Sequence, residues 1–380
     1  MNRFKFRISA DVEHNADRTD TARSPPPLEV HIAADASGGS RPQPSMSDVA
    51  RHAGVAIGTV SNTLNSPEKV SERTRRKVLG AIAELGFVRN DAARSLAAGS
   101  STTIGLVLAD LGNSFFVDIA RGVEQVMRRR GFDVLIANTE IDRDREVRNL
   151  ELFERSRVAG ILLAPLDTPL AHSGVLPIRS TPTVLVNFTS DTNAYPSVAV
   201  DEQRGGALAA SHVLERGARR VLFVGGPLFL TAVGDRHRGA SAAVEEAAGA
   251  RLELLETRGL NIRHGRQAAQ LILERGAGTY DAIVAASDLL AMGMVQVLDE
   301  VPGFSVPGDL MITGYDNNHF ASESSIPIST VSQPGEEMGS TAADLLLEKI
   351  DNPGVPNRAV ILSPHLVPRR STLGDSWRRD

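Results

Sequence analysis

Between Ser45 and Asn65, small and polar side chains recur on one side of a short predicted helix. Val60 and Leu64 lie four residues apart and form its buried stripe. The outward positions are then Ile57, Gly58, Ser61 and Asn62. An asparagine can both donate to and accept from a base edge, whereas an isoleucine offers apolar contact. This set of side chains therefore suits contact with nucleic acid, although an ordinary solvent-exposed helix face has a similar composition.

A preceding helix and a glycine turn would position that face. Ser45 is a suitable N-cap, and Asp48 three residues later suits the positive end of a helix. Gly54 supplies the left-handed turn residue before the second helix begins. The pattern predicts a helix-turn-helix whose second helix can enter a DNA major groove. On this stretch alone, an ordinary helical hairpin is an equally good interpretation.

A third predicted helix follows, capped by Ser71 and ending at Gly86. Its first turns hold Arg73, Arg75, Arg76 and Lys77. Such a run is usually a solvated face, but next to the helical hairpin phosphate contact is the better interpretation. Residues 41–100 hold 9 Lys and Arg against 5 Asp and Glu, whereas the whole chain has a net charge of -5. A basic module on an acidic body indicates two separate tasks.

Composition limits the remaining possibilities. The chain has 380 residues, enough for two or three domains. It has no cysteine, which excludes disulfides and thiolate metal sites. No apolar run is long enough to span a bilayer, and we expect a cytoplasmic, nucleoid-associated protein. Residues 1–44 are rich in proline and glycine, and we expect a disordered extension there.

Residues 45–89 form the predicted helix-turn-helix domain, and residues 90–101 form a short alanine-rich hinge helix and linker. From residue 102, apolar strands alternate with amphipathic helices, which predicts doubly wound parallel sheets in an α/β core. Because the core at 102–371 is long, we expect two lobes with a cleft between them. The predicted crossovers lie near residue 188 and near Tyr315–Asn318. The expected ranges are 102–187 with 316–345 for the N-lobe, 188–315 with 346–371 for the C-lobe, and 372–380 for a tail.

The chain resembles the lactose-repressor (LacI/GalR) family of bacterial transcription regulators from about Ser45 to about Ser371. The strings that carry this resemblance are specific and occur in the family's order: Asp48-Val-Ala, Ala53-Gly-Val, Thr59-Val-Ser, Ala83-Glu-Leu-Gly-Phe, Asn113-Ser-Phe-Phe, Gly225-Gly-Pro, Ser287-Asp, Gly314-Tyr-Asp and Gln333-Pro. The resemblance implies a DNA-binding headpiece, a hinge helix and a core similar to sugar-binding periplasmic proteins. It also implies a homodimer that binds an inverted-repeat operator in double-stranded DNA.

The resemblance assigns DNA contacts to a set of headpiece and hinge residues: Ser45, Ile57, Gly58, Thr59, Ser61, Asn62, Asn90 and Leu96. Leu96 matches the residue that wedges between base pairs in the minor groove, although it could instead pack the hinge onto the core. The family commonly has arginine at Asn62. Asparagine pairs with adenine and arginine with guanine, so we expect an operator that differs at that base.

The resemblance also assigns contacts with a small-molecule effector in the cleft: Asn113, Phe115, Phe116, Asp167, Asn187, Arg236 and Asp288. Each has a structural alternative, since the phenylalanines could be core residues and Asp288 could cap the helix that begins there. Arg236 could pair with groups near Asp235. We interpret Asp316, Asp201 and Gly205-Gly206 as structural residues at turns and lobe junctions.

Common signatures of catalysis do not occur in the sequence. It has no Gly-x-x-x-x-Gly-Lys loop, no Gly-x-Gly-x-x-Gly, no Gly-x-Ser-x-Gly and no His-Glu-x-x-His. We therefore expect no enzyme activity, no cofactor and no metal. The expected function is a transcription repressor whose operator affinity responds to a small metabolite, a sugar or a sugar derivative. The alternatives are a solute-binding protein of an uptake system, and a transcription activator on the same scaffold.

Overall fold

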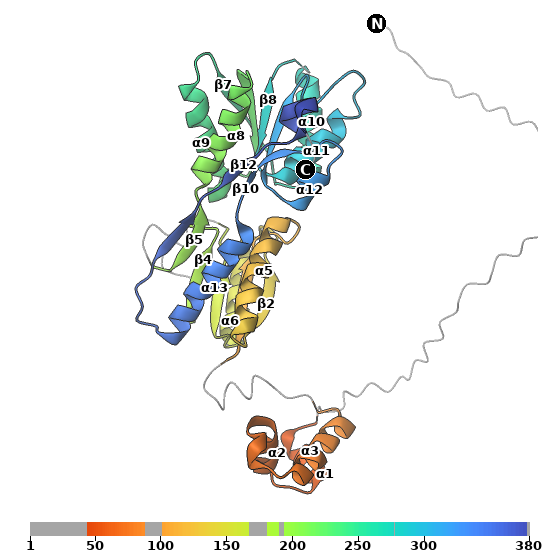
Figure 1. Cartoon of the computed structure of the whole chain (residues 1–380), viewed down its shortest axis with the longest axis vertical. Helices are drawn as coiled ribbons and strands as arrows, with labels where there is room; N and C mark the ends of the chain where they lie inside the picture. Colours follow the sequence, from red (N-terminus) through yellow and green to blue (C-terminus); the bar gives the residue numbers. More distant parts are fainter. Residues whose placement is uncertain (1–43, 88–100, 167–180, 190–193, 277, 378–380) are drawn as a thin grey trace, which may run out of the picture. The chain divides into compact units, whose positions relative to one another are not determined.

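The computed structural model describes residues 44–87, 101–166, 181–189, 194–276 and 278–377. The chain divides into two compact units, Met1–Arg89 and Asn90–Asp380, and each is described by itself (Figure 1). The predicted disordered extension at 1–44 and hinge helix at 90–101 lie almost entirely outside the described residues.

The first unit is a small bundle of helices. It comprises α1 (Met46–Ala53), α2 (Ile57–Asn65), a 3-10 turn (Pro67–Lys69) and α3 (Glu72–Leu85). Ser45 and Asp48 form a reciprocal capping box at the start of α1, and Gly54 ends this helix with a φ of 65°. Its small core contains Val49, Ala50, Val60, Val78 and Ala81. The predicted helix-turn-helix is confirmed.

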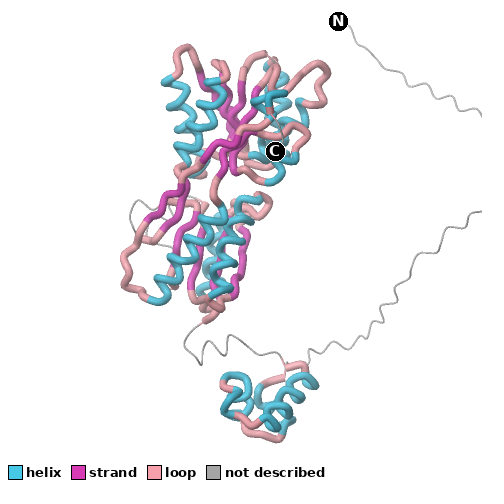
Figure 2. Tube along the Cα trace, viewed as in Figure 1, coloured by secondary structure: helices cyan, strands magenta, loops and turns pink. Residues whose placement is uncertain are grey.

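The second unit contains two six-stranded sheets with helices on both faces (Figure 2). The N-lobe sheet has the order β11-β5-β4-β3-β1-β2, and all its strands are parallel. Its elements are β1 (Thr103–Leu108), α5 (Ser114–Arg129), β2 (Asp133–Asn138), α6 (Arg143–Arg155), β3 (Gly160–Leu163), β4 (Thr183–Val186), β5 (Ser197–Val200), α13 (Gly335–Asp351) and β11 (Ala359–Leu362).

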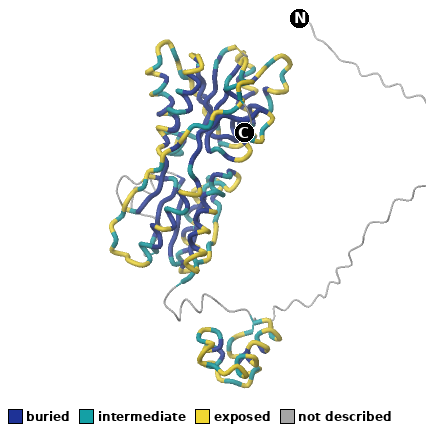
Figure 3. Tube along the Cα trace, in the orientation of Figure 1, coloured by how far each residue is buried: buried dark blue, intermediate teal, exposed yellow. Residues whose placement is uncertain are grey.

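The C-lobe sheet has the order β12-β10-β9-β8-β6-β7, and only β12 runs antiparallel within it. Its elements are α8 (Glu202–Glu215), β6 (Arg220–Gly225), α9 (Thr231–Glu246), β7 (Arg251–Glu256), α10 (Ile262–Arg275), β8 (Ala282–Ala285), α11 (Asp288–Leu298), β9 (Met311–Asp316), α12 (His319–Glu323), β10 (Ser329–Ser332), β12 (His365–Val367) and α14 (Arg370–Leu373). In both lobes the central strands are buried on both faces (Figure 3).

The predicted crossovers between the lobes are wrong. β5 pairs with β4, so the chain enters the C-lobe after Val200 and not near residue 188. β10 pairs with β9, so the chain returns at Gln333 and Pro334 and not at Tyr315–Asn318. It crosses a third time between β11 and β12. β5 and β10 are four-residue strands containing serine or threonine. Their sequences therefore carry little strand signal, although the sheets bury them completely.

The predicted tail at 372–380 is also wrong at its beginning. Thr372 is buried, and its hydroxyl lies 2.7 Å from Nε2 of His212 and 2.6 Å from the hydroxyl of Ser329. Ser371 donates to the carbonyl of Ile312 on β9. These bonds join α14 to the C-lobe and give the buried hydroxyls of Ser371 and Thr372 their partners. In the described part of the chain, no helix has the length and apolar character needed to cross a membrane.

Candidate functional site

The outward face of α2 is the predicted one. Ile57 is 51% exposed, and Gly58 and Asn62 are exposed beside it. Val60 and Thr63 point into the bundle, and the hydroxyl of Thr63 donates to the carbonyl of Thr59. This face combines an apolar side chain, that of Ile57, with the amide of Asn62. It is consistent with a helix that inserts into a groove.

The other predicted DNA contacts differ in their exposure and in the hydrogen bonds that they already make. Thr59 and Ser61 are partly buried at the edge of the outward face. Ser45 uses its hydroxyl in the capping box, where it donates to Asp48 at 2.6 Å. If Ser45 contacts DNA, its side chain must do so while its hydroxyl keeps the hydrogen bond to Asp48. Asn90 and Leu96 lie outside the described residues.

The basic cluster of α3 is partly neutralised. Arg75 pairs with Glu72 at 2.8 Å, and Arg76 lies 3.9 Å from the same carboxylate. Arg73 and Lys77 are exposed and make no ion pair within the described part of the chain. Arg73 and Lys77 therefore carry charges that no described carboxylate compensates, and they can meet phosphates.

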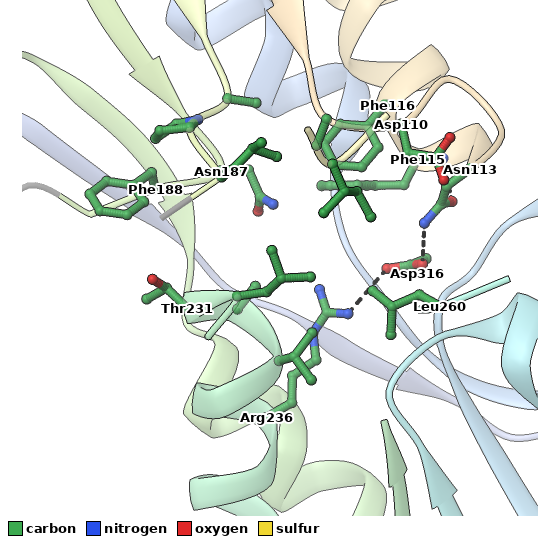
Figure 4. A pocket seen from close by; sticks show the side chains of 18 of the residues that line it. Asp110, Asn113, Phe115, Phe116, Asn187, Phe188, Thr231, Arg236, Leu260 and Asp316 are labelled. Atoms are coloured by element: carbon green, nitrogen blue, oxygen red, sulfur yellow. Dashed lines mark hydrogen bonds and ion pairs between the residues drawn. The ribbon is translucent and has the colours of Figure 1, made fainter. Parts of the chain in front are cut away.

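A cavity lies between the two lobes of the second unit (Figure 4). Its volume is about 90 Å³, so it is narrow. It is lined by groups from both lobes: Ala109, Asp110, Asn113, Phe115, Phe116, Ile141, Ala164, Pro165, Leu166, Asn187 and Phe188 from the N-lobe, and Leu230, Thr231, Ala232, Val233, Arg236, Leu260, Leu289 and Asp316 from the C-lobe. The lining brings together five of the seven predicted effector contacts, from segments more than 100 residues apart.

Arg236 reaches the cavity from α9 and is held by a buried ion pair. Its Nε and Nη2 atoms donate to the two carboxylate oxygens of Glu202 at 2.8 and 2.9 Å. Nη1 donates to the carbonyl of Ala286 at 2.7 Å, and the guanidinium lies 3.7 Å from the ring centre of Tyr315. Burial alone would lower the pKa of Arg236, but the carboxylates of Glu202 and Asp316 raise it. Arg236 is therefore a fixed cation.

Glu202, the carboxylate partner of Arg236, was not predicted from the sequence. It lies on α8, which packs closely on α9 because two glycines leave room. A Cβ atom at Gly206 would lie 1.9 Å from the carbonyl oxygen of Arg236, and one at Gly239 would lie 1.8 Å from that of Gln203. Asp235, the partner that we considered for Arg236, pairs with Arg238 instead.

Asp316 ends β9 and lines the cavity, so its interpretation as a structural turn residue is too narrow. It accepts from Nδ2 of Asn113 at 2.7 Å and from Nε2 of Gln333 at 2.7 Å, and it lies 3.6 Å from Arg236. Burial raises its pKa to about 6, against the lowering effect of Arg236 and Asn113. Because Asn113 belongs to the N-lobe, this hydrogen bond joins the lobes across the cavity (Figure 4). Asp316 lies at the carboxyl end of a parallel strand, where ligands bind in α/β sheets, so the sequence could have predicted it as a cavity residue.

Asp288 is a wrong prediction as a cavity residue. It is the first residue of α11 and is buried behind the lining, where it accepts from the backbone N–H of Asn318 at 2.8 Å. Its other oxygen has no hydrogen-bond partner. Burial and the nearby Asp316 raise its pKa well above the usual range, which favours the neutral acid. The side chain of the preceding Ser287 caps α11.

The N-lobe wall is aromatic. Phe115 and Phe116 lie in the first turn of α5 with their ring centres 5.3 Å apart, edge to face. Phe115 is buried, and Phe116 is partly buried. The capping side chain of Asn113 accepts from the backbone N–H of Phe115 and so fixes this turn. Asn187 follows β4 with a φ of 55°, and its Oδ1 atom is buried without a partner. Asp167 lies outside the described residues.

Groups of histidine, aspartate and glutamate that could hold a metal ion do not occur within the described ranges. The cavity instead has aromatic and aliphatic walls, a compensated cation and a few amide and hydroxyl groups. This combination is suited to binding a small organic molecule rather than to activating a nucleophile.

The chain matches the family model of bacterial regulatory proteins of the lacI family at residues 45–90, and a periplasmic binding protein-like domain at residues 210–372. It is 32% identical to the HTH-type transcriptional regulator RegA of Clostridium saccharobutylicum, over 87% of this chain and 99% of that protein. It is also 32% identical to the ribose operon repressor of Escherichia coli strain K12, over 86% and 99% of the two chains.

A solved LacI family regulator from Enterococcus faecium with bound ribose is 26% identical, with a TM-score of 0.63 over 71% of this chain and 98% of that one. The structure of a transcriptional regulator CelR–cellobiose complex is 29% identical, with a TM-score of 0.62 over 86% and 99%.

Proposed function

Because the chain belongs to the LacI family of bacterial regulatory proteins, we propose that a small neutral molecule bound between its two lobes sets its affinity for operator DNA. The protein is a DNA-binding transcription regulator. The observation that carries the proposal is the cavity lined by Arg236 and Asp316 on one wall and by Phe115 and Phe116 on the other.

The charge of the cavity favours a neutral ligand. One guanidinium, that of Arg236, faces two carboxylates, those of Glu202 and Asp316. A ligand carboxylate or phosphate would meet no uncompensated cation and would be repelled. Hydroxyl groups can donate to Asp316 and accept from Arg236, and the phenylalanine rings suit the apolar face of a ring. A sugar or sugar derivative meets these requirements, and the two solved relatives have ribose and cellobiose bound.

Base reading is assigned to Ile57 and Asn62, with Thr59 and Ser61 as phosphate contacts. Ile57 contacts a thymine methyl group, and Asn62 pairs with adenine through its amide. Arg73 and Lys77 add contacts with phosphates that do not depend on sequence. Repression is the direction that the named relatives favour, and the headpiece argues against an uptake protein.

The ligand acts by favouring one arrangement of the lobes. Asp316 accepts both from Asn113 of the N-lobe and from Gln333 of the crossover between the lobes. A ligand that competes for this carboxylate therefore changes the relative stability of the open and closed arrangements. In a homodimer, that change would move the paired N-lobes and the segments leading to the headpieces.

The test has two parts. Selection of operators from random DNA by the full chain should return an inverted repeat with adenine at the base facing Asn62, and Asn62→Ala should lose that preference. Binding should weaken steeply with salt. A panel of sugars is then screened by thermal shift and by release from, or retention on, the selected DNA. A monomer that binds DNA without salt dependence would contradict the proposal, as would ligands that stabilise the protein without changing DNA affinity.

A further inference from the structure

A second cavity adjoins the first and is not explained by a single-ring ligand. It shares Asn187, Phe188, Thr231 and Ala232 with the first cavity. Its volume is about 360 Å³, whereas that of the first is about 90 Å³. It continues past the shared residues along the groups that begin α8 and α9 and end β5: Ala199, Val200, Glu202, Gln203, Asp235 and Arg238.

The two cavities are joined at one end of the first. Figure 4 shows Asn113 and Asp316 at one side of the first cavity, and Phe188 and Thr231 at the other. Phe188 and Thr231 are shared with the second cavity. A ligand anchored on Asp316 therefore has its far end directed toward the larger space. Because the first cavity is the smaller, we expect it to take a single ring and any further group to extend into the second.

The second cavity is lined by a carboxylate and a guanidinium that lie side by side. Asp235 accepts from Nε2 of Gln203 at 3.1 Å and pairs with Arg238. The side chain of Arg238 is 61% exposed, and that of Asp235 is 21% exposed. Both remain accessible to a ligand. The carboxylate of Asp235 can accept from one hydroxyl while the guanidinium of Arg238 donates to another, and vicinal hydroxyls of a sugar can meet both groups at once. Asn187, at the junction, has an oxygen with no partner.

We propose that the second cavity is a subsite for a second hydroxylated ring, so that the effector is a two-unit glycoside rather than a monosaccharide. This inference rests on the proposed function, because it needs a first ring in the cavity at Asp316. Asp235 and Arg238 bind the second ring, and Asn187 accepts from a hydroxyl near the linkage. The narrow junction selects the linkage geometry.

The experiment measures binding by calorimetry of the full chain with neutral monosaccharides and with the disaccharides built on them. The probes are glucose with cellobiose, maltose and trehalose, and galactose with lactose and melibiose. We expect one disaccharide to bind at least about tenfold more tightly than its own monosaccharide, since two or three added hydrogen bonds supply that difference. Asp235→Asn and Arg238→Gln should each weaken that disaccharide about tenfold and change the monosaccharide by less than about twofold.

Glu245→Gln is the matched control, because it removes one exposed carboxylate from the same helix away from the cavity. It should leave both affinities unchanged. Two results would overturn the inference: no disaccharide binds more tightly than its monosaccharide, or the two variants weaken both classes of ligand equally. Tight monosaccharide binding that controls DNA release would then uphold the proposed function while the second subsite fails.

Discussion

The two lobes have the same order of their first five strands, yet they contribute different chemistry to the cavity. The orders are 5-4-3-1-2 in the N-lobe and 10-9-8-6-7 in the C-lobe. The C-lobe provides the buried ion pair, with Arg236 held by Glu202 and close to Asp316. The N-lobe provides mainly rings and amides, from Phe115, Phe116, Asn113 and Asn187, together with the carboxylate of Asp110.

This difference has a physical consequence for lobe movement. A buried ion pair is costly to break, since a charge that loses its partner while it stays buried has neither the opposite charge nor water to stabilise it. Both charged partners of the Arg236 pair lie in one lobe, so they stay paired when the lobes separate. The N-lobe side chain that bonds to Asp316, that of Asn113, is itself neutral, and such a hydrogen bond forms and breaks at about 1–2 kcal/mol. Because the ion pair stays within one lobe and the hydrogen bond between the lobes is weak, small changes in ligand contacts are enough to open or close the cavity.

The largest expected effect comes from removing the C-lobe cation. Arg236→Met leaves the carboxylate of Glu202 buried without its partner, so the free energy of unfolding should fall by about 3–5 kcal/mol. Denaturant unfolding measures this. The matched N-lobe change is Arg121→Met, whose partner Asp118 lies 3.0 Å away and whose side chain is 66% exposed. It should cost no more than about 1 kcal/mol. Equal losses in the two variants would mean that the buried ion pair of Arg236 contributes no more to stability than the exposed ion pair of Arg121.

A pH-dependent effect is expected in the N-lobe. Glu146 of α6 is buried, accepts from the backbone N–H of Leu166 at 2.9 Å, and leaves its other oxygen unpaired. Burial raises its pKa to about 7, although the Leu166 bond opposes this. In the unfolded chain the group ionises near its ordinary pKa of 4.5. Between these values the folded state binds more protons, so stability falls as the pH rises.

Glu146→Gln removes this loss while keeping the acceptor for Leu166. The variant should be more stable than the natural protein at pH 8, by up to about 3 kcal/mol, with the difference shrinking toward pH 4.5. Urea unfolding across this pH range measures it. A difference that does not vary with pH would mean that Glu146 has the same pKa in the folded and the unfolded protein, so that burial does not raise it.

A smaller effect is expected where the lobes meet. Asn113→Ser keeps a side chain that can cap α5 but cannot reach Asp316. Loss of the bond across the cavity should lower stability by about 1 kcal/mol and shift the lobes toward the open arrangement. Because the chain has no cysteine, two introduced cysteines, one in each lobe, can be labelled cleanly for distance measurements. An unchanged distance distribution would show that this bond does not hold the lobes together.

The smallest effect is expected at the aromatic wall. Phe116→Leu keeps apolar volume but loses the flat ring, so ligand affinity should fall a few-fold and stability should change by less than about 1.5 kcal/mol. Calorimetry with the bound sugar measures the affinity. If the affinity is unchanged, the ring does not contact the ligand.

Local patterns in the sequence predicted much of the fold. The period of α2 placed Ile57 and Asn62 outward, because Val60 had to face the bundle. Alternating apolar strands and amphipathic helices predicted parallel sheets, since a strand covered on both faces must be apolar throughout. Arg236 and the two phenylalanines were also predicted, from the resemblance to a known family.

Tertiary structure decided the rest. Asp288 and Asp316 both lie at the ends of strands, and sequence alone cannot say which carboxylate faces the cavity. Packing buries Asp288 at the start of α11, behind the cavity lining, and leaves Asp316 in the lining. Glu202 meets Arg236 across 34 residues because glycines let two helices approach. The crossovers depend on the short strands β5 and β10, whose burial comes from their neighbours in the sheet and not from their own four residues.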